Sequence, residues 1–310
     1  MAKAKEIIGL DCAADALPAA AEVLRARFDE VVNLRGAALD FSDIEGVHRM
    51  RVAIRRLRSA LRDFTPLMAK RPPKRLRKEL KQLADALGAV RDHDVALVAL
   101  EALRTEAETE TVKEGVGRLL EERNRLRAAA RLDLTEALAV SGVNDLQARF
   151  TASIGKVISR KKLKRTVSFG EAGRGVVAAG LRDLLTLGAS LYEPFDIEEL
   201  HEMRIAAKRL RYAVELFTAC WGESVVPFAE EIAEMQGFLG EVHDCDVWIE
   251  SMGSRLRGGQ TNTSDYQAAT WLLSEFVKKR TKEYRSALKL WSEWQSNDFA
   301  GRMRATIQIP

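Results

Sequence analysis

An internal repeat constrains the fold of this chain more than any other feature of its sequence. Residues 41–58 and 195–211 share one pattern, in which a histidine is followed by basic residues at helical spacing. The two histidines are 153 residues apart, close to half of the 310-residue chain. A second pair of similar segments, 87–95 and 239–247, follows at nearly the same separation. Two motifs repeated in the same order predict a tandem duplication of one structural unit.

Each half is expected to be a series of helices, because no segment shows the alternation of a strand and prolines are few. The predicted fold is therefore all-α, with a first helical-bundle repeat at 1–142 and a second at 143–310. The predicted helices lie near 18–36, 43–65, 73–88, 91–108, 111–139, 171–190, 196–219, 223–239, 243–256 and 265–294.

Local signals mark several helix ends. Asp43 and Asp196 each precede an apolar-periodic run and are predicted to be N-caps. Pro66 should end the helix that carries the first motif, because proline breaks the helical hydrogen-bond pattern. Residues 141–170, which include a basic run at 160–165, are expected to join the two halves.

The composition and net charge of the chain indicate only its broad class of protein. The net charge is +4, from 49 Lys and Arg against 45 Asp and Glu, so the segregation of charge matters more than its sum. The three cysteines are widely spaced and form no zinc pattern, which favours a reduced, cytoplasmic setting. No segment is apolar over the roughly 18 to 20 residues that span a bilayer, so no membrane association is predicted.

The first motif predicts a helix with one cationic face. At about 100° per residue, five side chains fall within an arc of roughly 80°, and the apolar residues fall on the opposite side. We call the five the first cationic row: His48, Arg51, Arg55, Arg58 and Arg62. The second motif gives a shorter second cationic row: His201, Arg204, Lys208 and Arg211.

Rows of like charge destabilise a helix by a few tenths of a kcal/mol per pair, and a bound anion would relieve the repulsion. Guanidinium groups bind phosphate oxygens bidentately, and a linear row suits an extended polyanion. The sequence has no glycine-rich phosphate loop, and few aromatics lie near the rows to stack on bases. The alternative is that acidic neighbours or solvent neutralise the rows.

Other basic residues are candidates for the same site. They belong to the repeated motifs or to the last helix of each half, where Arg123 and Arg280 are expected to be recurring positions. The additional candidates are Arg56, Arg91, Arg123, Arg209 and Arg280.

The motifs together resemble the CHAD family (conserved histidine α-helical domain). They read His-x-x-Arg-x-x-x-Arg-Arg-x-Arg-x-x-x-x-x-Phe at 48–64, with Lys208 in place of the first Arg of the pair at 201–217, and Leu-Gly-x-x-Arg-Asp-x-Asp-Val at 87–95. The resemblance implies two helical bundles related by pseudo-twofold symmetry, a basic central cleft, recognition of inorganic polyphosphate, and association with polyphosphate granules. It also implies that the cleft is lined by His48, Arg51, Arg55, Arg56, Arg58, His201, Arg204, Lys208, Arg209 and Arg211. One departure is His243, which stands where Arg91 stands in the first half.

Catalysis and metal binding are not expected. The segments around His93 and His243 contain Asp and Cys, but adjacent residues on a helix diverge by about 100° and cannot all face one ion. Asp92 and Asp244 are expected to orient arginines, and no cofactor is predicted. The alternatives are a module that binds nucleic acid or an acidic protein and, less favoured, a metal-dependent phosphohydrolase. A histidine beside bound phosphate should gain charge, which predicts tighter binding at pH 6 than at pH 8.

Overall fold

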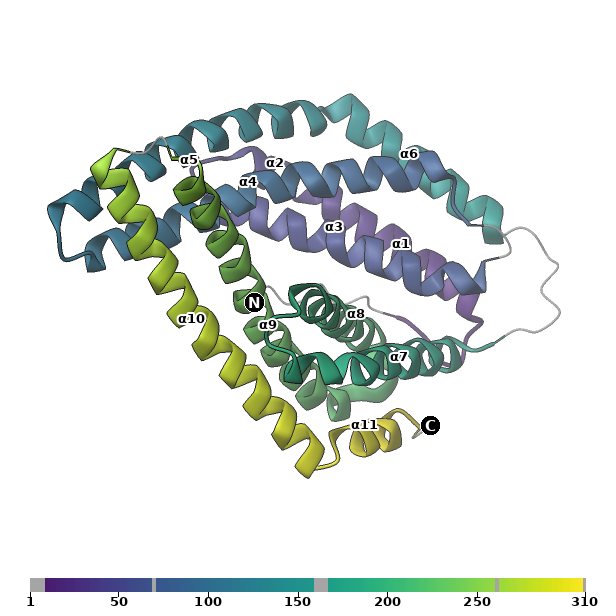
Figure 1. Ribbon diagram of the computed structural model, residues 1–310. Helices are drawn as coiled ribbons and strands as arrows, with labels where there is room; N and C mark the ends of the chain where they lie inside the picture. Colours follow the sequence, from purple (N-terminus) through teal and green to yellow (C-terminus); the bar gives the residue numbers. More distant parts are fainter. Residues whose placement is uncertain (1–8, 69–70, 159–166, 260–261, 309–310) are drawn as a thin grey trace. The chain divides into compact units, whose positions relative to one another are not determined.

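The computed structural model describes residues 9–68, 71–158, 167–259 and 262–308. Within these ranges the chain forms helices joined by turns and loops, and the one β-type pairing is an isolated bridge between Asp15 and Ser168 (Figure 1). The chain divides into two compact units. One comprises Met1–Val98 with Arg123–Gly173, and the other Ala99–Glu122 with Arg174–Pro310.

The first unit is built around α1, which packs against both α3 and α6. Phe28 of α1 and Phe150 of α6 are buried against each other, with ring centroids 5.0 Å apart. The elements of this unit are α1 (Ala16–Asn33), α2 (Arg35–Leu39), α3 (Ile44–Phe64), η1 (Thr65–Leu67), most of α4 (Lys74–Glu106), the second half of α5 (Glu110–Ala137) and α6 (Val140–Ile158).

The second unit is centred on α9, which packs against both α8 and α10. Trp294, near the end of α10, stacks on Phe299 of α11 with ring centroids 4.1 Å apart. The elements are the end of α4, the first half of α5, most of α7 (Phe169–Thr186), η2 (Leu187–Tyr192), α8 (Ile197–Trp221), η3 (Gly222–Val225), α9 (Val226–Arg257), α10 (Thr263–Ser296) and α11 (Phe299–Gln308).

The two motif helices begin as predicted. The Asp43 carboxylate accepts a hydrogen bond of 2.9 Å from the backbone N–H of Glu45, and Asp196 accepts one of 3.0 Å from Glu199. Both aspartates are therefore confirmed as N-caps, which satisfy donors that a helix start leaves unpaired. Helix α3 ends at Phe64, directly before the turn that contains Pro66.

The predicted helix breaks near residues 88–91 and 239–243 were wrong. Helices α4 and α9 each run straight through the Leu-Gly segment of the second motif. A lone glycine in a helix costs only about 1 kcal/mol, which the packing of two long helices outweighs. The stretch 141–170 was also expected to be a connection, but α6 occupies most of it, and the basic run at 160–165 lies outside the described residues.

The two compact units are interleaved along the chain, whereas the sequence predicted consecutive repeats at 1–142 and 143–310. A compact unit is defined by contacts in space, whereas a repeat is defined by similarity of sequence. The consecutive repeats therefore stay a prediction. In the part of the chain that the structure describes, no helix combines the length and apolarity needed to cross a bilayer.

Gly46 allows α2 and α3 to approach closely at the start of the first motif helix. A Cβ atom at this position would overlap the backbone carbonyl of Ala37, which cannot easily move. We expect Gly46→Ala to lower the free energy of unfolding by about 1–3 kcal/mol, the usual effect of overpacking. Gly175→Ala is the control, because Gly175 is helical with open space around it. This change should raise the free energy of unfolding by about 0.5–1 kcal/mol. Chemical denaturation measures both, and equal effects of the two changes would contradict this account.

Candidate functional site

The first cationic row lies along one face of α3, opposite the buried apolar residues. Four of its members, His48, Arg51, Arg55 and Arg58, are half-exposed. Arg62 is exposed but folds back, and its guanidinium donates to the buried carboxylate of Asp63 at 2.7 Å. The four half-exposed residues therefore form the accessible part of the row.

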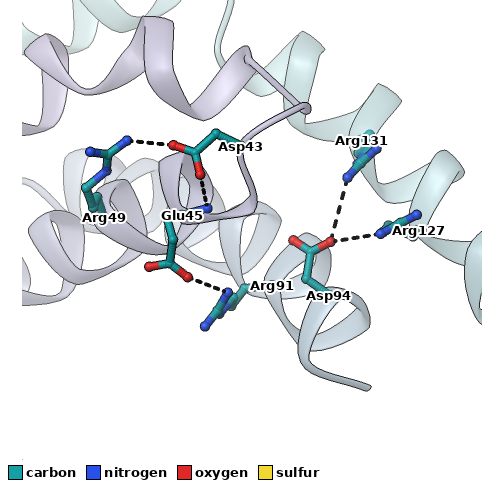
Figure 2. A network of polar contacts seen from close by, with 7 residues as sticks. All are labelled: Asp43, Glu45, Arg49, Arg91, Asp94, Arg127 and Arg131. Carbon is teal, nitrogen blue, oxygen red and sulfur yellow. Dashed lines mark hydrogen bonds and ion pairs between the residues drawn. The ribbon is translucent and has the colours of Figure 1, made fainter. Parts of the chain in front are cut away.

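Helix α4 contributes an acidic side chain, Asp92, and a basic one, Arg91, beside the first cationic row. The Arg51 guanidinium contacts the exposed carboxylate of Asp92 at 3.2 Å, as predicted for that aspartate. Arg91 contacts Glu45, the first-turn acid of α3, at 3.4 Å (Figure 2). Arg58, in contrast, has no hydrogen bond or ion pair with any residue in the described ranges. Acidic neighbours therefore neutralise the first cationic row only in part.

The second cationic row begins in the same way on α8. Arg204 and Lys208 are half-exposed, one turn apart. Arg211 is buried and contacts Glu215 at 3.3 Å, one turn further along the helix. Arg56 and Arg209 occupy equivalent positions in the two motifs. They differ in exposure, since Arg56 is buried and Arg209 is exposed.

His201, at the start of the second cationic row, contacts His243 of α9. The two Nδ1 atoms lie 3.0 Å apart, and the ring centroids 4.3 Å apart. A guanidinium nitrogen of Arg204 lies 3.5 Å from the same Nδ1 of His201. In the first unit, the buried Nδ1 of His48 has no hydrogen-bond partner among the described residues. The histidines that begin the two rows are therefore held differently.

All four histidines are less basic than usual. Burial lowers the pKa of His48, and the cations Arg91, Arg51 and Arg55 lower it further. Burial followed by Arg204 lowers the pKa of His201. Burial, with Arg204 and His201 next, lowers the pKa of His243 to about 4. Near neutral pH these rings are uncharged, so the arginines and Lys208 supply the positive charge of the rows.

A buried carboxylate on each long helix holds arginines of the neighbouring helix. Asp94 of α4 is 1% exposed and contacts Arg127 and Arg131 of α5 at 3.3 and 3.7 Å (Figure 2). Asp246 of α9 contacts Arg280 of α10 at 2.5 Å, and Arg280 also donates to the Pro194 carbonyl. These pairs tie α4 to α5 and α9 to α10.

The correspondence expected between Arg123 and Arg280 stays a prediction. Arg127 makes a contact with Asp94 like the one that Arg280 makes with Asp246. The Arg280 guanidinium is committed to an internal carboxylate and a carbonyl. Arg123 is half-exposed and lies near enough to His93 to lower the pKa of that histidine, after burial.

Sequence reasoning missed the roles of Asp94, Asp246 and Arg131. The available signal was the second aspartate of each Asp-x-Asp motif, which recurs in both halves with an arginine 33 or 34 residues later. Among the residues that the structure describes, no group of three or more His, Cys, Asp or Glu side chains is placed to hold a metal ion.

Asp94 and Asp92 lie on the same helix and allow a matched test of the buried pair. Asp94→Asn should destabilise the fold by about 3 kcal/mol, because it leaves Arg127 and Arg131 beside an uncharged buried group. Asp92→Asn should cost less than about 1 kcal/mol, since the Asp92 side chain is 70% exposed. Equilibrium unfolding of both variants measures the difference, and similar losses would contradict the proposed role of Asp94.

The lowered pKa of His243 predicts a stability that depends on pH. The unfolded chain binds a proton at this ring near pH 6.5, whereas the folded protein does so only near pH 4. The contribution of His243 is therefore complete above about pH 6.5 and is lost as the pH falls toward 4. NMR titration of the ring protons should give a midpoint near 4, and His243→Gln should flatten the loss of stability in that window. A midpoint at or above 6.5 would contradict the placement of this ring.

Comparison with known proteins places the chain among known folds. A family model described as "CHAD domain" matches residues 22–253. A search of curated proteins found no match. The chain is similar to the crystal structure of the CHAD domain from the plant Ricinus communis, with 22% identity and a TM-score of 0.75 over 94% of this chain and 96% of that one. It is also similar to PptA from Streptomyces chartreusis, with 15% identity and a TM-score of 0.63 over 90% of this chain and all of that one.

At these identities the two solved structures show the fold alone. The family model covers well over half of the chain, including both histidines that begin the cationic rows and both Asp-x-Asp segments. On that match, the chain belongs to the CHAD-domain family.

Proposed function

We propose that this protein binds inorganic polyphosphate through the cationic rows of α3 and α8. The observation that carries the proposal is the accessible part of the first cationic row, where one histidine and three arginines stand half-exposed on one helix face. Only part of this charge meets an acidic neighbour, since Arg51 contacts Asp92 while Arg58 has no partner in the described ranges. Such a surface favours a negatively charged ligand.

The chemistry of the row favours an extended phosphate chain over a compact anion. Guanidinium groups present planar donors that match phosphate oxygens. Arg51 to Arg58 covers roughly 10 Å at the rise of an α-helix, so successive arginines can contact successive phosphates. A single small anion would engage only one or two of them.

The second cationic row supports the same proposal with fewer residues. Arg204 and Lys208 are half-exposed, whereas Arg211 is buried beside Glu215. We therefore assign ligand contact in this row to His201, Arg204 and Lys208, and a supporting role to Arg211. Association with polyphosphate granules is part of the proposal, on the resemblance to the CHAD family. The reduced setting expected from the cysteines was wrong, because Cys12 and Cys220 are disulfide-bonded.

We propose binding without catalysis. The acidic side chains beside the first cationic row are engaged by arginines, Asp92 by Arg51, Asp63 by Arg62 and Glu45 by Arg91. In these positions they set the direction of guanidinium groups, and this role requires no reaction.

Nucleic acid is the second candidate ligand, and one observation favours it. Tyr192 and Phe195, just before α8, are 60% and 88% exposed, although few aromatics were expected near the rows. Exposed rings of this kind can stack on bases. An acidic protein partner is the third candidate, and it would use the same charges without stacking.

The rows can be tested by titrating the protein with long-chain polyphosphate at about 150 mM salt. We expect tight binding by the wild type, and roughly tenfold or greater weakening in the pairs Arg51→Ala/Arg58→Ala and Arg204→Ala/Lys208→Ala, since a hydrogen bond to a charged group contributes about 1.5–3 kcal/mol. The matched control is Lys74→Ala/Lys78→Ala on α4, which removes the same charge from exposed residues outside the rows.

Two results would contradict the proposal. Equal weakening by the α4 control and the row variants would mean that only net charge matters, through general counterion release. Displacement of polyphosphate by single-stranded DNA, without the reverse, would favour the nucleic-acid alternative.

A further inference from the structure

The two cationic rows differ beside the histidine that begins each of them. The second motif supplies one residue there, and this residue is not the same in the two units. In the first unit this residue is Arg91 of α4, whose positive charge lowers the pKa of His48. In the second unit it is His243 of α9, whose ring contacts His201. A permanently charged group in one row thus corresponds to a titratable group in the other.

The contact between the two imidazoles sets how many protons the pair can hold. With the Nδ1 atoms 3.0 Å apart, one ring donates its Nδ1–H and the other accepts with its lone pair. One further proton can bind the outer Nε2 of the donor ring, and the shared hydrogen bond then becomes charge-assisted and stronger. A second proton would set two N–H groups against each other. The pair therefore takes up one proton while the contact lasts.

In the protein without ligand, the groups around the two rings disfavour the binding of this proton. On α8, Arg204 lies 3.5 Å from the Nδ1 of His201, Lys208 adds a second cation, and Glu202 is the opposing acid. Burial and these cations act together to lower the pKa values of both rings.

The other helix and its neighbour carry further charged groups. On α9, the exposed Asp244 is next in sequence to His243. On α10, Lys279 is held by Glu241 of α9 at 2.6 Å. A phosphate anion beside Arg204 would therefore be the main new negative charge near the rings, and it would reverse the balance that excludes the proton.

We infer that the His201–His243 pair is a proton-operated part of the second cationic row, which takes up one proton when a phosphate anion binds beside Arg204. This inference rests on the proposed function and adds its regulation. The second row then binds polyphosphate more tightly as the pH falls, whereas Arg91 gives the first row a charge that does not change with pH. One proton taken up on binding corresponds to a change in affinity of up to about tenfold per pH unit.

The test is calorimetric titration of the full chain with long-chain polyphosphate at pH 6 and pH 8, in two buffers of different ionisation enthalpy at each pH. The difference between buffers gives the number of protons taken up. His243→Arg places the charged group of the first row in the second, and should bind more tightly than wild type at pH 8 while taking up about one proton fewer at pH 6. Arg91→His is the reciprocal change and should weaken binding at pH 8 and steepen the pH dependence.

The outcomes separate this inference from the proposed function. Polyphosphate binding with the same proton uptake in wild type and His243→Arg would overturn the inference and leave the proposed function standing. Absence of binding by the wild type at both pH values would overturn both. The double variant His201→Gln/His243→Gln removes both rings, and it should lose the proton that the wild type takes up. If it retains wild-type proton uptake, the pair is not the source and the inference is wrong.

Discussion

The candidate site depends on a helix that packs one face into the core and keeps cations on the other. In α3 the buried face includes Met50, Ile54, Leu57 and Phe64, all fully buried. Burying such side chains contributes about 1.5–3 kcal/mol each, whereas repulsion between like charges one turn apart costs only a few tenths. Packing therefore fixes the helix in place, and the charges of the row are held together without a ligand.

The long helices beside the rows are tied to their neighbours by internal ion pairs. Asp94 and Asp246 are nearly inaccessible to solvent and engage Arg127 and Arg280 of the following helices. The same pattern leaves Asp92, two residues earlier on α4, exposed and in contact with Arg51 of the row. One short motif thus supplies both a structural contact and a contact that orients a candidate binding residue.

Much of this could be predicted from the sequence, because it depends on short-range patterns. The caps at Asp43 and Asp196, the apolar face of α3 and its end before Pro66 all follow from local chemistry. The uninterrupted α4 could not be predicted in this way, because tertiary packing overrides the weak helix propensity of Gly88. Nor could the burial of Arg211, which helical spacing alone places on the same face as Arg204.

The most direct test of the central claim is an NMR titration of the isotope-labelled protein with polyphosphate, followed through backbone amides and arginine side chains. We expect the largest changes in chemical shift along 48–58 of α3 and 201–208 of α8. The exposed basic residues of α4 near Lys74 should change little. Shifts concentrated at Lys74 and its neighbours, with α3 and α8 unchanged, would contradict the claim that the cationic rows are the binding surface.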